Sequence, residues 1–150
     1  MKSIINSIID LLNKGRCFVS PMLALRLGVA WFFYKSALTK VTQVLPWPQV
    51  SDTTLSLFKD YYQVPLLDPV TAAHLGTYAE LGLPLLLVAG LFTRFAALGL
   101  FVFNLVAYLS LPEPNTVAMI EHLVVYLFMI LAIIVHGPGK VSLDHLLWRK

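Results

Sequence analysis

Charged residues are scarce in this 150-residue chain: Asp, Glu, Lys and Arg make up 13% of it, whereas hydrophobic residues make up 58%. A soluble globular domain typically carries about 25% charged residues. Because so few charges cannot cover a water-facing surface, the composition predicts that lipid surrounds much of the folded chain. The 11 basic residues and the net charge of +3 are too sparse for a nucleic-acid-binding surface, so no nucleic-acid partner is expected.

Cysteine occurs once, at Cys17. A lone thiol excludes an intramolecular disulfide, a CxxC redox pair and a cysteine-ligated iron–sulfur cluster within this chain. The eight glycines are scattered through apolar segments and form no phosphate-binding loop. Any redox chemistry therefore has to use a bound cofactor, a quinone or a partner subunit.

The stretch YAELGLPLLLVAGLFTR, from Tyr78 to Arg94, combines apolar length with a buried charge. It belongs to an apolar run from Ala72 to Phe92 that, as a helix, rises about 31 Å, roughly the thickness of a bilayer's hydrocarbon core. Glu80 lies inside this run. A carboxyl group at that depth is usually tolerated only when it has a partner or a task. We therefore expect other parts of the chain to provide that partner.

The order of apolar segments and helix breakers predicts an all-α integral membrane four-helix bundle, with residues 1–150 as a single domain. The spans are expected at about 21–44, 71–92, 95–111 and 116–136, with an outer loop over 45–70. Amphipathic patterns at both ends predict interfacial helices, one over Ser3–Asn13 and one in the tail KVSLDHLLWRK.

Local signals refine these boundaries. Asp68 is the expected N-cap of the second span and Pro69 its first helical residue. Pro84 should kink this helix, because it removes the hydrogen bond to the carbonyl four residues earlier. In the outer loop, Ser56–Val64 could form a short interfacial helix, and Thr93-Arg94 is expected to be a tight turn.

Basic residues predict the orientation of the bundle, because positive charge gathers in cytoplasmic loops. With both termini cytoplasmic, the inner side holds Lys2, Lys14, Arg16, Arg94, Lys140, Arg149 and Lys150. The outer loops carry Lys59, with Lys40 at their edge, and the acidic residues Asp52, Asp60, Asp68 and Glu113. The expected location is a bacterial inner membrane, crossed several times.

Polar side chains from several spans fall at one level in the outer half of the bilayer. From a rise of 1.5 Å per residue, Glu80 lies roughly 13 Å deep, Lys35 and Asn104 about 10 Å, and Glu121-His122 about 8 Å. Lys40 lies close to the outer boundary. This level predicts a shared interior site that opens toward the outside. A structural ion pair between Glu80 and one of the lysines is the alternative.

Individual residues of this level have further alternatives. His122 could contact a quinone carbonyl, or ligate a metal or haem together with His74, although two histidines without a fixed spacing are weak evidence for a metal site. Asn104 could instead join helices by an interhelical hydrogen bond. Arg26, in the inner half, could extend its guanidinium to the membrane surface.

Three segments of the chain resemble the DoxX family of four-helix bacterial membrane proteins: LALRLGVAWFFYKSALTKV, AELGLPLLLVAGLFTRFAALGLFVFNLVA and IEHLVVYLFMILAIIVHGPGKVSLD. The resemblance covers about Leu23 to Leu146. The early Arg and late Lys of the first helix correspond to Arg26 and Lys40. Further matches are Glu80, the Gly-Leu-x-x-Arg turn at Gly90 and Arg94, and the Gly-Pro-Gly at Gly137–Gly139. Ala37 stands where the family usually has a small Gly.

This resemblance implies a plasma-membrane, redox-associated subunit, because relatives include a subunit of a thiosulfate:quinone oxidoreductase and a partner of thiol-stress proteins. We expect the chain to connect a protein partner on the outer side to the quinone pool, with quinone favoured over haem as cofactor. The expected catalytic residues are Glu80, Lys35 and Lys40, and the expected cofactor-binding residues are Glu121, His122, Asn104 and Arg26.

Two other functions fit the same residues. The chain could be a non-catalytic scaffold whose polar cluster only fixes helix register while the outer loop docks a partner. It could also be a small export factor for a metal-binding peptide, since the long outer loop resembles a branch of the family found beside small metal-responsive peptides. Because four helices enclose little volume, the export function would require a homo-oligomer.

Overall fold

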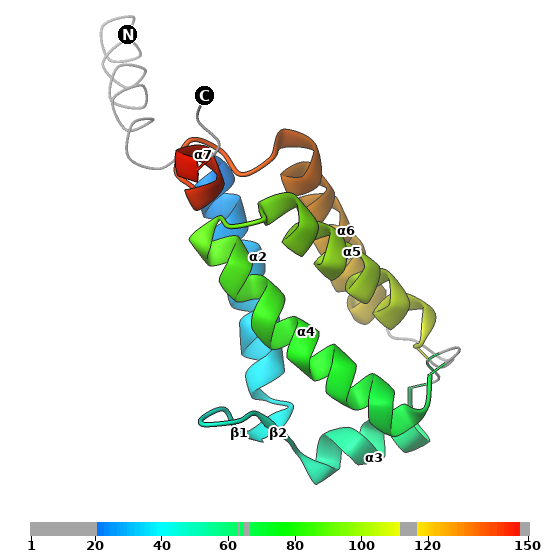
Figure 1. Ribbon diagram of the computed structural model, residues 1–150. Coiled ribbons are helices and arrows are strands. Elements are labelled where there is room, and N and C mark those ends of the chain that lie inside the picture. The colour runs from blue at the N-terminus through cyan, green and yellow to red at the C-terminus, as the bar shows by residue number, and fades with distance from the viewer. Residues whose placement is uncertain (1–20, 63, 65–66, 112–116, 148–150) are drawn as a thin grey trace, which may run out of the picture.

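The computed structural model describes residues 21–62, 64, 67–111 and 117–147, and this part of the chain is mostly helical (Figure 1). Its long helices are α2 (Pro21–Leu38), α4 (Pro69–Ala89), α5 (Thr93–Leu109) and α6 (Val117–His136). The shorter helices are α3 (Asp52–Asp60) and α7 (Leu143–Leu147). Strands β1 (Val41–Gln43) and β2 (Gln49–Val50) form a small antiparallel hairpin. The expected helix over Ser3–Asn13 lies outside the described residues.

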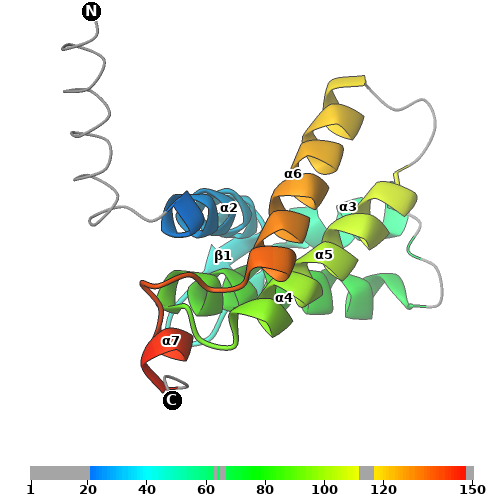
Figure 2. The same cartoon turned by 90° about the horizontal axis from the view of Figure 1, so that it is seen from above.

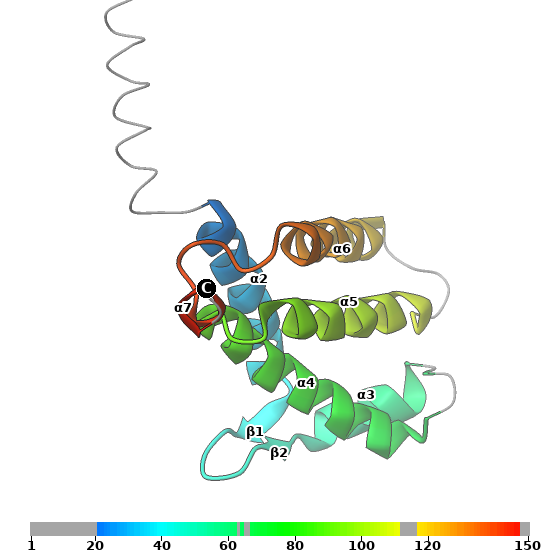
Figure 3. The same ribbon diagram turned by 45° about the horizontal axis from the view of Figure 1, so that its top comes forward.

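The four long helices form one packed group. Helix α2 packs against α4 and α6, and α5 packs against α4 and α6. Figure 3 shows α5 and α6 side by side, with α3 and the hairpin next to α4. Viewed from above, α7 lies beside the carboxyl end of α4 (Figure 2). The hairpin and α3 therefore lie at one end of the group and α7 at the other.

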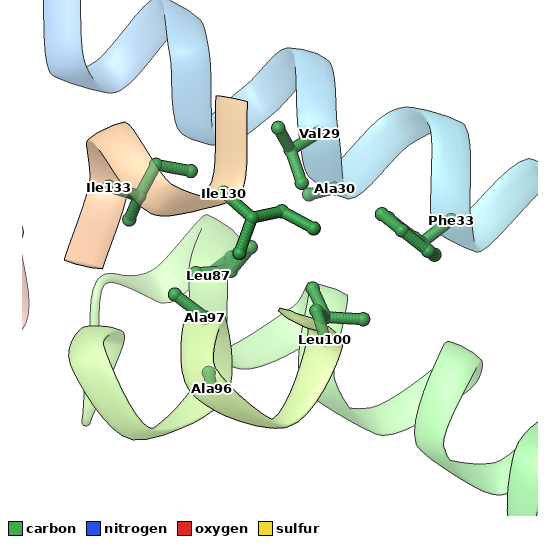
Figure 4. Close-up of a cluster of buried hydrophobic side chains, with 9 residues drawn as sticks. All are labelled: Val29, Ala30, Phe33, Leu87, Ala96, Ala97, Leu100, Ile130 and Ile133. Carbon is green, nitrogen blue, oxygen red and sulfur yellow. The ribbon is translucent and has the colours of Figure 1, made fainter. Parts of the chain in front are cut away.

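A buried apolar cluster holds the long helices together. Figure 4 shows its side chains pointing toward one another from all four of them: Val29, Ala30, Phe33, Leu87, Ala96, Ala97, Leu100, Ile130 and Ile133. Several members are alanines, which let the helix backbones approach closely. This core fixes the relative positions of the helices that surround the polar site.

The outward faces of the long helices are also apolar. Trp31 on α2 is 69% exposed, Phe95 on α5 is 74% exposed and Phe128 on α6 is 68% exposed. A helix on the surface of a soluble protein instead turns its polar face outward. Among the described residues, α4 is the helix long and apolar enough to cross a membrane, while α5 and residues Ile120–His136 of α6 are apolar but shorter.

The first helix is shorter than expected. It ends at Leu38 and not near Val44, because Thr39 and Lys40 form a turn and the chain then enters β1. The carbonyl of Lys40 accepts hydrogen bonds from the backbone N–H of Ser51, at 2.9 Å, and from the hydroxyl of Thr54, at 3.0 Å. These contacts replace helical hydrogen bonds. The hairpin was not predicted, but the described residues are mostly helical, which is consistent with the expected all-α class.

The outer-loop helix begins earlier than Ser56. Ser51 caps α3 by accepting a hydrogen bond from the backbone N–H of Thr54, so the helix covers Asp52–Asp60. A serine before an exposed polar turn is a good N-cap. The helix expected over Ser56–Val64 therefore exists, but shifted toward the amino terminus.

Helix α4 begins as its sequence predicts. The carboxylate of Asp68 accepts hydrogen bonds from the backbone N–H groups of Val70 and Thr71, and Pro69 is the first helical residue. The helix runs on through the buried Pro84 and ends at Gly90, whose φ of 68° is the left-handed conformation that glycine favours at a helix end. The turn expected at Thr93-Arg94 was wrong, since both residues belong to the first turn of α5.

Candidate functional site

Lys40 and Glu80 form an ion pair between the end of α2 and the middle of α4. The Lys40 Nζ lies 2.6 Å from both carboxylate oxygens of Glu80. The Glu80 side chain is 4% exposed and that of Lys40 is 24% exposed. Ser36 adds a longer hydrogen bond of 3.4 Å to the same carboxylate. The expected partner of Glu80 is thus Lys40.

The end of the fold that carries the hairpin and α3 holds Lys40 in place. Ser36 lies in the last turn of α2 and Lys40 in the turn that follows Leu38, and both side chains hydrogen-bond to Glu80. The carbonyl of Lys40 is fixed by Ser51 and Thr54, and its ammonium lies 5.7 Å from the centre of the Phe103 ring. A cation over an aromatic face is attracted by the negative centre of the ring. Three elements therefore position one ammonium group.

The ion pair borders a cavity of about 680 Å³ between the long helices and α3. Binding sites for small molecules typically enclose roughly 300–1,000 Å³ and are mostly apolar with a few polar groups. Most of the lining here is apolar. The polar and aromatic side chains around it are Phe32, Ser36, Lys40, Phe58, Tyr62, Glu80, Phe103, Asn104, Ser110 and His122. The cavity therefore combines an apolar wall with a buried carboxylate and an ammonium.

Asn104 contributes an amide to the same cavity and is 1% exposed. Its Nδ2 donates a hydrogen bond of 2.8 Å to the carbonyl of Leu123, which confirms that this residue links α5 to α6. Its Oδ1 is buried and has no hydrogen-bond partner among the described residues. The amide nitrogen therefore joins two helices, whereas the amide oxygen is unpaired among the described residues.

Tyr62 lines the cavity just after α3. Burial raises the pKa of its hydroxyl, and the neighbouring Tyr61 and the carboxylate of Glu80 raise it further. The phenol therefore keeps its proton at neutral pH and can donate a hydrogen bond. Neither Tyr62 nor Ser36 was singled out from the sequence. Ser36 is close to Lys40 in the sequence, whereas only the tertiary fold brings Tyr62 to this place.

The structure brings together some of the predicted site residues and separates others. Lys40, Glu80, Asn104 and His122 all line the cavity. Lys35 and Glu121 are exposed and do not line it. His74 is engaged with its own helix, its Nδ1 lying 2.8 Å from the carbonyl of Val70.

Arg26 lies away from this cavity and does not reach toward the membrane surface. It is 1% exposed, so the interpretation of an outstretched guanidinium was wrong. Its nitrogens donate to four backbone carbonyls, two at the end of α4 and two after α6: Leu87 at 2.9 Å, Val88 at 3.1 Å, Pro138 at 2.7 Å and Val141 at 2.8 Å. The carbonyls at the end of a helix carry partial negative charge, which a cation stabilises.

Comparison with known proteins assigns a family. The sequence profile described as DoxX matches residues 21–113, which contain Ser36, Lys40, Glu80 and Asn104. The chain is also similar to a protein of Haemophilus influenzae described as uncharacterized, with 29% identity over 130 residues that cover 84% of this chain and 82% of that protein. No solved structure matches the chain.

Proposed function

Since the chain belongs to the DoxX family, a membership that indicates a membrane protein, we propose that it is a multi-pass inner-membrane subunit that binds a quinone in the cavity beside Lys40 and Glu80. In this proposal the four long helices span the bilayer as a bundle. A protein partner on the outer side exchanges electrons with the quinone pool through this subunit. The observation that carries the proposal is a buried carboxylate that faces an apolar cavity.

The distribution of side chains supports the membrane arrangement. All four long helices present large apolar residues to the outside: Trp31, Leu85, Phe95 and Phe128 are each more than half exposed. The end that carries α7 has Arg94, Lys140 and Asp144 and is net positive, whereas the end that carries α3 has Lys40 and Lys59 with Asp52, Asp60 and Asp68 and is net negative. Positive charge favours the cytoplasmic side. We therefore place α7 and both termini in the cytoplasm and the hairpin and α3 outside.

The cavity fits a quinone in size and chemistry. Its apolar walls suit a ring and an isoprenoid chain, and its volume is that of a small-molecule site. The Tyr62 hydroxyl and the Asn104 amide add polar groups that can orient a head group. When bound, a quinone supplies a carrier of two electrons and two protons.

The residues of the chain would handle the protons. Glu80 accepts a proton at its carboxylate, and Lys40 stabilises the ionised form through its 2.6 Å contacts. Lys40 is also the more exposed member of the pair, at the outer end of the cavity. A proton can therefore pass between this buried carboxylate and the outer side without crossing the apolar core.

A binding measurement with a cavity-filling variant tests this proposal. Ala79 lines the cavity, whereas Ala89 is exposed on the same helix. We expect unaltered protein in lipid nanodiscs to bind a short-chain ubiquinone, Ala79→Phe to bind it at least tenfold more weakly, and Ala89→Phe to bind it normally. Equal binding by all three proteins would place the quinone elsewhere or in the lipid.

A scaffold function is the second candidate. Lys40 and Glu80 satisfy each other and tie α2 to α4, as a purely structural pair would. If this is their whole role, unaltered protein will show no saturable quinone binding, and Glu80→Gln will lower only thermal stability.

A further inference from the structure

The free oxygen of Asn104 limits what the cavity can hold. The Nδ2 atom has to face the Leu123 carbonyl at 2.8 Å, because a carbonyl only accepts hydrogen bonds. The orientation of the amide follows from this contact, and Oδ1 is the atom left buried without a partner among the residues that the structure describes. Leaving a buried acceptor unpaired is unfavourable. A ligand that donates a hydrogen bond at this point would remove that penalty.

Among the described residues, no donor around the cavity forms a hydrogen bond with this oxygen, Tyr62 and His122 included. The Lys40 ammonium and the Ser36 hydroxyl are directed to Glu80. The Ser110 hydroxyl donates to the carbonyl of Val106 on its own helix, at 2.7 Å. The Asn104 oxygen is therefore an unpaired acceptor, among the described residues, on a side chain that lines the cavity.

We infer that the cavity selects a ligand with a hydroxyl donor at Asn104, and hence the reduced, hydroxyl-bearing form of the quinone over the oxidised form. This inference rests on the proposed function. The oxygens of a quinone only accept hydrogen bonds, so one of them facing Asn104 Oδ1 would place two acceptors together. A quinol hydroxyl donates to the same atom.

The second polar group of the cavity is compatible with this preference. A carboxylate has about four acceptor positions, and Lys40 and Ser36 leave Glu80 with capacity for another donor. A quinol has two hydroxyl groups, and the cavity has an acceptor on α4 and another on α5. The amide and the carboxylate thus both suit the reduced form.

The difference in affinity between quinol and quinone comes from one hydrogen bond that the quinol gains and one repulsion between two acceptor oxygens that it avoids. We expect the quinol to bind about tenfold more tightly than the quinone. For a two-electron couple, a tenfold preference for the reduced form raises the potential of the bound couple by about 30 mV. The site would therefore hold its ligand reduced more readily than the lipid does.

Anaerobic binding of three related probes to unaltered protein in nanodiscs tests the inference without altering the fold. The probes are decylubiquinone, its quinol and the dimethyl ether of that quinol, which keeps the shape but lacks both donors. We expect the quinol to bind about tenfold more tightly than either of the others. Equal binding of all three, as when a water molecule satisfies Asn104, or tighter binding of the quinone, overturns the inference and leaves the proposed function intact. If none of the three binds, the proposed function itself fails.

A pair of variants assigns the preference to one atom. Asn104→Leu removes the acceptor, and Ser110→Ala removes a hydroxyl from the same cavity that is bonded within its own helix. We expect Asn104→Leu to bind quinol and quinone equally and Ser110→Ala to keep the preference. A preference that persists in folded Asn104→Leu contradicts the role of Asn104. If this variant does not fold, the binding of the three probes to unaltered protein still decides whether the cavity prefers the reduced form.

Discussion

At Glu80, burial and charge act against each other. The carboxyl group is almost completely removed from solvent, and its ionised form is stable there only because an ammonium lies 2.6 Å away. The pair is asymmetric, since the Lys40 side chain retains 24% exposure. Breaking a buried pair by removing one partner leaves an uncompensated charge and is strongly destabilising. The role of Lys40 can therefore be measured as a loss of stability.

Replacing Lys40 should cost far more than replacing the nearby Lys35. We expect Lys40→Met to lower the free energy of unfolding by about 3 kcal/mol, because Glu80 loses its partner. Lys35→Met removes the same charge from an exposed position of α2, five residues earlier, and should change stability by less than about 0.5 kcal/mol. Thermal unfolding in detergent measures both. Equal effects of the two changes would mean that the ion pair contributes nothing specific.

At the scale of the elements, the short helix α7 packs against the turn between α4 and α5, at the end of the fold opposite the hairpin. Phe92, at the N-cap of α5, has a φ of 46° and no side-chain cap. Asp144 of α7 supplies it instead, its carboxylate accepting hydrogen bonds of 2.8 Å from the backbone N–H groups of Phe92 and Thr93. The backbone N–H of Asp144 donates in return to the carbonyl of Gly90, at 2.9 Å. Helix α7 thus joins the turn between α4 and α5.

This cap predicts a pH dependence of stability. Partial burial opposes the ionisation of Asp144, but the hydrogen bonds from Thr93 and Phe92 outweigh it and, with the charge of Arg26, hold the pKa of this carboxyl below its ordinary value. A lowered pKa in the folded state means that the contribution is complete above about pH 4, the unfolded value, and is lost as the pH falls through the folded value.

The variant Asp144→Asn should therefore be less stable than unaltered protein at pH 7, by about 1 kcal/mol, with the difference shrinking toward pH 3. Unfolding temperatures measured across this pH range give the difference. Asp60→Asn removes an exposed carboxyl group at the end of α3 and is the matched control. A difference between Asp144→Asn and unaltered protein that stays constant with pH would contradict the assigned charge state.

Features of the fold that depend on neighbouring residues in the sequence could be predicted, whereas those that depend on tertiary contacts could not. The start of α4 at Asp68-Pro69 and its end at Gly90 follow from local capping rules and were predicted within a few residues. Depth along a helix also brought Glu80 near a late lysine of the first helix. Lys35 was an equal candidate, because the turn after Leu38 that redirects Lys40 is held by tertiary contacts to Ser51 and Thr54.

Other features depend entirely on tertiary structure. Arg26 looked like a membrane-surface residue by its position along the first helix, but it binds carbonyls that come from the ends of two other helices. The sequence pattern of the first helix does not indicate hydrogen-bond partners that come from other segments of the chain. The cavity likewise combines residues from α2 to α6, so its volume could not be inferred from any single stretch.

At the scale of the whole molecule, the fold separates two tasks. The apolar cluster and the Arg26 contacts lie toward the end of the fold that carries α7, whereas the ion pair and the cavity lie toward the hairpin and α3. The apolar cluster can hold the helices together, while the end with the ion pair leaves room for the cavity. This arrangement suits the proposed function, in which the partner and the quinone would both reach the end that carries the hairpin and α3.

The measurement that tests this account most directly is the quinone content of protein purified from native membranes in lipid nanodiscs, determined in a solvent extract against the bulk lipid. We predict about one quinone per chain in unaltered protein and only the level of the bulk lipid in Ala79→Phe, with Ala89→Phe unchanged. A quinone content at the level of the bulk lipid in all three proteins would contradict the account and leave Lys40 and Glu80 as a structural pair.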